Sequence, residues 1–138
     1  AQGLVRDGEG ATRFVEIDVS GGASTQECLD VAFTIAHSPL VKTALFAADA
    51  NWGRILAAVG RAPVANLDVT SVSVSMNGTL IAANGGRAPG YREEDLAESL
   101  KNAEIRLHID LGRGSHRECV WTSDLSHEYV RINAEYRS

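Results

Sequence analysis

The sequence contains few lysines, although its overall charge content is ordinary for a globular protein. Lys42 and Lys101 are the two lysines, and 13 basic side chains are outnumbered by 18 acidic ones, which gives a net charge of −5. Nucleic acids and anionic membranes bind clusters of Lys and Arg. We therefore expect neither nucleic acid nor a membrane surface as a partner.

Cysteines and long apolar segments are also scarce. Cys28 and Cys119 are the two cysteines, too few for a disulfide framework, and a chain of this length folds without one. We expect both to be reduced thiols in a cytoplasmic protein. No apolar run approaches the roughly 20 residues of a membrane span, and the first residues do not resemble a signal peptide.

The chain does not begin with methionine, because its first residue is Ala1 and its one methionine is Met76. We expect it to be a processed product or a portion of a larger protein. A composition that is 44% hydrophobic and 22% charged excludes a disordered tail and a coiled coil. Residues 1–138 are predicted to form a single domain.

Alternating apolar and polar residues are the main evidence for strands. They predict strands at residues 14–19, 70–76, 105–109 and 120–121, with a last short strand at residues 129–132. Asn77-Gly78 predicts a hairpin turn into residues 79–81, because both turn residues tolerate positive φ. The apolar run at residues 40–46 is interpreted as a buried strand, and residues 84–90 as a glycine-rich loop.

Three helices are predicted from capping residues and helical spacing. They run from Ser24 to a stop at Pro39, over residues 52–59 and over residues 93–101. Ser24 and Glu27 form a capping pair for the first helix, and Asp49 or Asn51 caps the second. The mixture of elements predicts an α+β domain with a mainly antiparallel sheet and helices packed on one face.

The common catalytic and metal-binding motifs are missing from the sequence. No glycine pattern is completed to a dinucleotide fingerprint, and there is no P-loop and no G-x-S-x-G elbow. The four histidines are scattered, without an H-E-x-x-H or C-x-x-C motif. His116 and Glu118 could share a strand face, but such a pair is more commonly solvated. We expect no metal.

Three stretches combine residues suited to ligand binding. Glu9 lies among glycines at residues 6–12, where it could meet an ammonium group or move a proton. Trp52 begins a helix within residues 49–54, and residues 131–138 carry many hydrogen-bonding groups. Each stretch also has a structural explanation: an acidic turn, a helix anchored by a core tryptophan, and a frayed terminus.

Taken together, these stretches resemble one family. The motifs DGEGAT (residues 7–12), NWGRILAAVG (residues 51–60) and VRINAEYRS (residues 130–138) are similar to the β chain of the ornithine acetyltransferase family of arginine biosynthesis. The resemblance extends over essentially the whole chain. It implies an N-terminal-nucleophile enzyme of the DmpA/ornithine-acetyltransferase type.

The resemblance implies a reaction and partners. Such enzymes move an acetyl group from N-acetylornithine to glutamate through an acyl-threonine intermediate, which is covalent catalysis. They need no cofactor, although some accept acetyl-coenzyme A as the acetyl donor. An α chain, formed by self-cleavage at an Ala-Thr bond, supplies the oxyanion hole. We therefore expect an αβ hetero-oligomer.

This chain departs from the family in having no N-terminal threonine. Ala11-Thr12 lies inside DGEGAT, whereas the scissile bond of the family lies upstream of that motif. The resemblance therefore implies the C-terminal portion of the β chain, with the nucleophile elsewhere and no catalytic residue here. Glu9, Asn133 and Ser138 match substrate-binding residues. Glu9 would face the substrate ammonium, and the other two would bind the amino-acid carboxylate.

Two other functions remain open from the sequence. The missing nucleophile is also compatible with a non-catalytic, amino-acid-binding regulatory α+β domain. Alternatively, the chain is a structural subunit in which the Trp52 region holds an interface.

Overall fold

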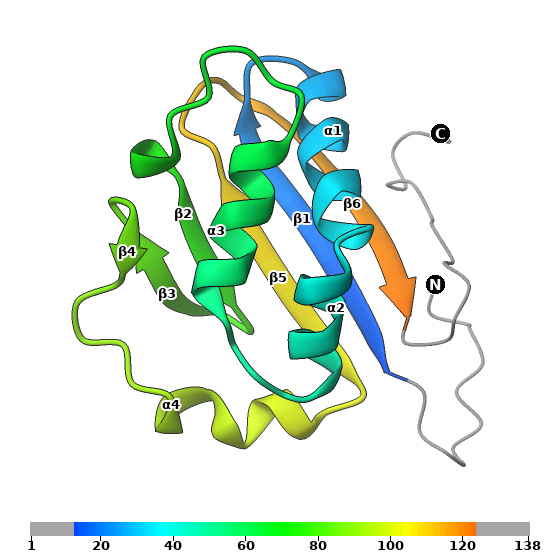
Figure 1. Cartoon of the computed structure of the whole chain (residues 1–138), viewed down its shortest axis with the longest axis vertical. Coiled ribbons are helices and arrows are strands. Elements are labelled where there is room, and N and C mark those ends of the chain that lie inside the picture. The colour runs from blue at the N-terminus through cyan, green and yellow to red at the C-terminus, as the bar shows by residue number, and fades with distance from the viewer. Residues whose placement is uncertain (1–12, 124–138) are drawn as a thin grey trace.

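The computed structural model describes residues 13–123, which form a sheet covered by helices (Figure 1). The sheet has six strands: β1 (Phe14–Gly22), β2 (Ser73–Met76), β3 (Thr79–Ala83), β4 (Gly86–Arg87), β5 (Glu104–Asp110) and β6 (His116–Ser123). Their order is β4-β3-β2-β5-β1-β6. The central pair β1 and β5 is parallel, and all other neighbouring strands are antiparallel. The predicted α+β class and mainly antiparallel sheet are confirmed.

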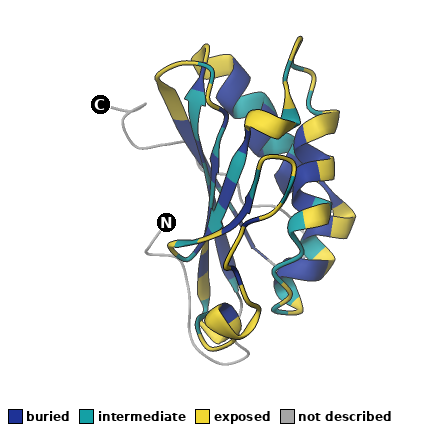
Figure 2. Ribbon diagram, turned by 90° about the vertical axis from the view of Figure 1, so that its left-hand side faces the viewer, coloured by how far each residue is buried: buried dark blue, intermediate teal, exposed yellow. Residues whose placement is uncertain are grey.

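The helices gather on one face of this sheet, as the sequence predicted. The long ones are α1 (Thr25–Ala36), α2 (Pro39–Phe46) and α3 (Trp52–Arg61). Figure 2 shows them as a layer on one side of the strands. The short helices are α4 (Glu94–Ala97) and two 3-10 turns, η1 (Val69–Ser71) and η2 (Ser99–Lys101).

Alternation along β1 separates the two faces of the sheet. Val15, Ile17 and Val19 are fully buried under the helices, whereas Glu16 and Asp18 point to the other face. The same period holds in β5, whose apolar residues are buried and whose polar residues are not. Most of the buried apolar residues that the structure describes lie on the helix side, whereas the opposite face carries polar side chains such as Glu16 and Asp18.

The capping pair at the start of α1 forms as predicted, with one difference. The Ser24 hydroxyl accepts a hydrogen bond from the Glu27 N–H at 3.1 Å. The Glu27 carboxylate reaches back to the N–H of Ala23 at 3.0 Å, one residue before the position expected for a capping box. Two donors at the helix start are thereby satisfied.

The strand predicted at residues 40–46 is wrong, because this segment is helix α2. Pro39 is the first helical residue, where its missing N–H costs nothing and its fixed φ suits the helix. Ser38 caps it by accepting the Val41 N–H at 3.2 Å. The proline that was predicted to end one helix therefore also begins the next.

Other boundaries differ in smaller ways. The helix predicted at residues 93–101 is divided into α4 and η2, and the predicted loop at residues 84–90 contains β4. Strand β2 begins at Ser73, after the turn η1, and α3 continues through Gly60 to Arg61. The strand predicted at residues 129–132 lies outside the described residues.

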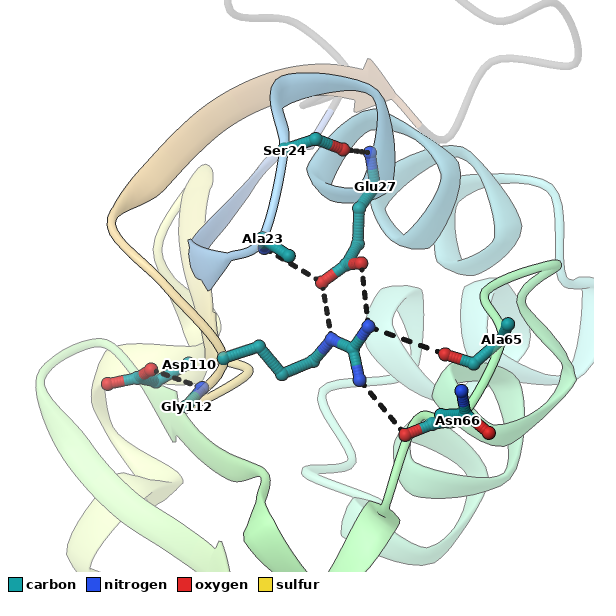
Figure 3. A network of polar contacts seen from close by, with 8 residues as sticks. Ala23, Ser24, Glu27, Ala65, Asn66, Asp110 and Gly112 are labelled. Carbon is teal, nitrogen blue, oxygen red and sulfur yellow. Dashed lines mark hydrogen bonds and ion pairs between the residues drawn. The ribbon is translucent and has the colours of Figure 1, made fainter.

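An ion pair between Arg113 and Glu27 joins the ends of several elements (Figure 3). The Arg113 Nε donates to Glu27 Oε2 at 2.6 Å and Nη2 donates to Oε1 at 3.0 Å, so the pair is bidentate. The same guanidinium donates to the carbonyls of Ala65 and Asn66 in the loop after α3. The Glu27 side chain is only 9% exposed. The hydrogen bonds from Arg113 lower the pKa of Glu27 despite its burial.

We predict that Glu27→Gln lowers the free energy of unfolding by about 2 kcal/mol at pH 7, because a charged, partly buried hydrogen-bonded pair is lost. Since the pKa of Glu27 is lowered by folding, this stabilisation is complete above the unfolded-state pKa of about 4.3 and is lost as pH falls through the folded-state pKa. Denaturant titrations from pH 7 to pH 3 should show the difference from the wild type shrinking in acid.

Glu98→Gln is the matched control, because Glu98 is exposed and its side chain makes no hydrogen bond or ion pair within residues 13–123. It should leave stability within about 0.5 kcal/mol of the wild type. An equally large loss in both variants would show that the Arg113–Glu27 pair has no special role.

Candidate functional site

A groove of about 560 Å³ lies between the start of α3 and the segment that connects β4 to α4. Figure 1 draws the segment from β4 to α4 at its lower left. We call it the α3 groove. One wall comes from residues 49–53 and the other from residues 87–94. The lining residues are Asp49, Ala50, Asn51, Trp52, Gly53, Arg87, Tyr91, Arg92, Glu93 and Glu94. The groove therefore contains the start of the NWGRILAAVG motif.

The first residues of α3, Trp52 and Gly53, line the groove. Asn51 caps the helix by accepting the N–H of Arg54 at 3.1 Å through its side-chain oxygen. Within the described part of the chain, the N–H groups of Trp52 and Gly53 have no acceptor. A Cβ at Gly53 would meet only the Asn51 side-chain oxygen, at 3.6 Å. The backbone is therefore accessible at the positive end of the helix dipole.

Trp52 has both of the roles considered from the sequence. Its ring is partly buried and packs against the hydrophobic core. It also lines the α3 groove. The tryptophan thus anchors the helix start and supplies an apolar part of the wall.

The opposite wall holds a buried hydroxyl. Tyr91 is 4% exposed, and its Oη has no hydrogen-bond partner within residues 13–123. Arg87 fixes the backbone there by donating from Nη1 to the Tyr91 carbonyl at 2.9 Å. Burial raises the pKa of Tyr91, and the carboxylates of Glu93 and Asp49 raise it further. The phenol is therefore neutral at pH 7 and retains a proton that it can donate.

Charges of both signs line the α3 groove. Its carboxylates are Asp49, Glu93 and Glu94, and its cations are Arg87 and Arg92. Arg92 already pairs with Asp95, at 3.5 Å. The ten lining residues include no cysteine, histidine, serine or threonine. This chemistry favours binding of a small polar molecule.

The open face of the sheet carries a second set of polar contacts. Asp18 forms a bidentate pair with Arg117, at 2.6 and 3.0 Å. The Cys119 thiol donates to Glu16 Oε2 at 3.2 Å. Ser20 Oγ and His108 Nε2 are 2.8 Å apart, between β1 and β5. These contacts connect neighbouring strands across the sheet.

The cysteines fit the expectation of reduced thiols. Both are free and buried. Burial raises the pKa of the Cys28 thiol, and burial together with the Glu16 carboxylate raises that of Cys119 strongly. Both are protonated at neutral pH and are therefore unreactive.

The described residues offer no metal centre. Across residues 13–123 no three His, Cys, Asp or Glu side chains are placed to hold an ion. His116 is exposed, whereas Glu118 on the same strand is buried. In the same part of the chain, no helix has the length and apolar character needed to cross a bilayer.

The three residues predicted to bind substrate lie outside the described residues. These are Glu9, Asn133 and Ser138. The described structure instead places the second of the three stretches, residues 49–54, beside residues that the sequence did not single out. Arg87 and Tyr91 were missed because they lie in and after the predicted glycine-rich loop, and no local pattern shows that a loop folds against a distant helix start.

The architecture defines the chain as an α+β protein with one helix-covered and one polar sheet face. It belongs to the ArgJ family, whose family model matches residues 1–138. This membership confirms the resemblance found in the three sequence motifs.

Individual relatives support the same assignment. The chain is 60% identical to the "Arginine biosynthesis bifunctional protein ArgJ" of Pseudomonas syringae pv. tomato, 59% to that of Pseudomonas fluorescens and 58% to that of Psychrobacter arcticus, each over all 138 residues. It spans 34% of the length of these relatives. The crystal structure of the protein of the same name from Bacillus halodurans matches with a TM-score of 0.77 and 35% identity, over 90% of this chain and 58% of that one.

We predict that Asn51→Ala lowers the free energy of unfolding by about 1 kcal/mol, because the Arg54 N–H loses its cap. Asn51→Ser restores an acceptor at the same position and should recover most of that loss. Thermal unfolding of the two variants beside the wild type measures the difference. If Ser and Ala destabilise equally, the cap does not hold the start of α3.

Proposed function

We propose that this chain is the C-terminal portion of the β chain of an acetyltransferase that moves an acetyl group from N-acetylornithine to glutamate. The observation that carries the proposal is the match to the ArgJ family over residues 1–138, with 60% identity to a bifunctional arginine-biosynthesis protein. The word "bifunctional" in the names of the relatives is compatible with acetyl-coenzyme A as a second donor.

The proposed reaction has two transfers through one threonine. The threonine hydroxyl attacks the acetyl carbonyl of N-acetylornithine, the C–N bond breaks, and the nitrogen takes a proton and leaves as ornithine. The amino group of glutamate then attacks the acyl-threonine ester, forming N-acetylglutamate and returning the hydroxyl. The threonine and the donors that stabilise the oxyanion belong to other parts of the enzyme, including the α chain.

This chain is proposed to supply substrate-binding residues. Glu9 would face a substrate ammonium, and Asn133 and Ser138 would hydrogen-bond a carboxylate. Support comes from the register of β1 and β6, in which Phe14 is the direct partner of Ser123. The segment that carries Glu9 and the segment that carries Asn133 are therefore joined to the sheet at neighbouring points, although they are far apart in sequence.

A second candidate function is amino-acid binding by a regulatory domain without catalysis. The α3 groove supports it, because its lining is polar and charged and contains no cysteine, serine, threonine or histidine. The two functions differ in whether an acyl-enzyme forms.

Intact mass spectrometry of all chains that co-purify with this one tests the main proposal. We expect a chain that begins with threonine and gains the mass of one acetyl group after incubation with N-acetylornithine. A complex in which no chain is acetylated would favour the regulatory function.

In the complete enzyme, Glu9→Gln and deletion of Ser138 should each raise the KM for an amino-acid substrate about tenfold, or slow transfer, because each loses a charged hydrogen bond. Glu98→Gln is the matched control and should have wild-type kinetics. Unchanged steady-state kinetics in both site variants would refute the assignment of these residues.

A further inference from the structure

We propose that Arg13 is a positioning residue for Glu9, the residue proposed above to face the substrate ammonium. Arg13 lies directly before β1, four residues after Glu9. The inference rests on the proposed function, because Glu9 needs a defined position only if it binds substrate. It adds to that function a residue of the described structure that acts through another side chain.

The guanidinium of Arg13 fixes the point at which the chain enters β1. Its Nη1 donates a hydrogen bond to the carbonyl oxygen of Leu100 at 2.7 Å, across 87 positions of sequence. Leu100 lies in η2 and its side chain is buried in the hydrophobic core. Because a hydrogen bond from a charged donor is stronger than one between neutral groups, this contact ties Arg13 firmly to η2.

The residue after Arg13 is held on both sides. The Phe14 N–H donates to the Ala103 carbonyl at 2.8 Å. Phe14 is also the sheet partner of Glu104 on β5 and of Ser123 on β6, because β1 lies between these two strands (Figure 1). The start of β1 therefore has a fixed place relative to η2, β5 and β6.

This fixed point restricts Glu9 more than the other predicted substrate residues. Glu9 is four residues from Arg13, and four residues of extended chain span at most about 14 Å. Asn133 is ten residues from Ser123, the last described residue, and ten residues span up to about 36 Å. A displacement of the chain at Arg13 is therefore expected to move Glu9, whereas the longer connection to Asn133 leaves that residue free to adjust.

Loss of the Arg13–Leu100 hydrogen bond also destabilises the domain, so positioning has to be separated from stability. Glu27→Gln is the matched control. Glu27 lies in α1, just after the opposite end of β1 from Arg13, and its substitution is expected to lower stability as well. If Arg13 acted through stability alone, Glu27→Gln would change the kinetics in the same way.

Steady-state kinetics of the complete enzyme test the proposal. Arg13→Met removes the guanidinium and keeps an unbranched apolar stem. We expect it to raise the KM for N-acetylornithine, which carries an ammonium on its side chain, at least about threefold with little change in kcat. Arg13→Lys keeps a cation at this position and should restore most of the wild-type KM. Glu27→Gln should have the wild-type KM below its melting transition.

Double variants show whether Arg13 acts through Glu9. Combined with Glu9→Gln, Arg13→Met should add nothing, so that the KM stays at the roughly tenfold increase of Glu9→Gln alone. Combined with deletion of Ser138, its effect should multiply to about thirtyfold. Multiplication with Glu9→Gln, or an equal rise in KM for Glu27→Gln, would overturn the proposal.

The same measurements distinguish failure of this inference from failure of the proposed function. If Glu9→Gln raises the KM and folded Arg13→Met does not, Arg13 has no positioning role and the proposed function stands. If Glu9→Gln leaves the KM unchanged, the assignment of Glu9 is refuted and the inference falls with it. Melting temperatures report folding, and Arg13→Gln, a polar replacement at this partly buried position, serves in the same combinations where Arg13→Met does not fold.

Discussion

The ion pair between Arg113 and Glu27 is the contact on which the upper end of the fold depends. It attaches the turn between β5 and β6 to the first turn of α1, and through the carbonyls of Ala65 and Asn66 it holds the chain that follows α3. This is possible only because the backbones come close together. A Cβ at Gly114 would stand 2.5 Å from the backbone oxygen of Gly22, at the end of β1. The turn that carries Arg113 therefore requires glycine at position 114.

Local features of the fold could be predicted from the sequence because they depend on interactions between residues that are close together in the chain. The alternation at residues 14–19, the Ser24 cap and the Asn77-Gly78 turn each act within a few positions, and all three form. The strand prediction for residues 40–46 was wrong because a short apolar run is equally compatible with a strand and with a buried helix. The decisive sign was Pro39 in the first helical position, which was interpreted only as the end of the preceding helix.

Only one wall of the α3 groove could be predicted from the sequence. Residues 49–54 carry a visible combination of a cap, a tryptophan and a glycine, and they form one wall of the α3 groove. The other wall, with Arg87 and Tyr91, comes from a distant segment brought there by the β2–β3–β4 meander. The burial of Tyr91 and its unpaired hydroxyl cannot be predicted from the neighbouring residues in the sequence, because both result from tertiary packing. Family membership therefore assigns the chain, while the structure locates a groove that the motifs alone do not define.

The pairing of Phe14 with Ser123 also determines how the domain would respond to mechanical force. Both residues stand at the same end of an antiparallel pair, and β6 is an edge strand of the sheet that residues 13–123 form. Tension applied through the two flanking segments would load the hydrogen bonds of this pair one after another, as in opening a zipper, instead of all together in shear. Such a pair yields at low force. The strand that terminates the sheet would thus be the first to peel away, and α1, which packs on it, would be uncovered next.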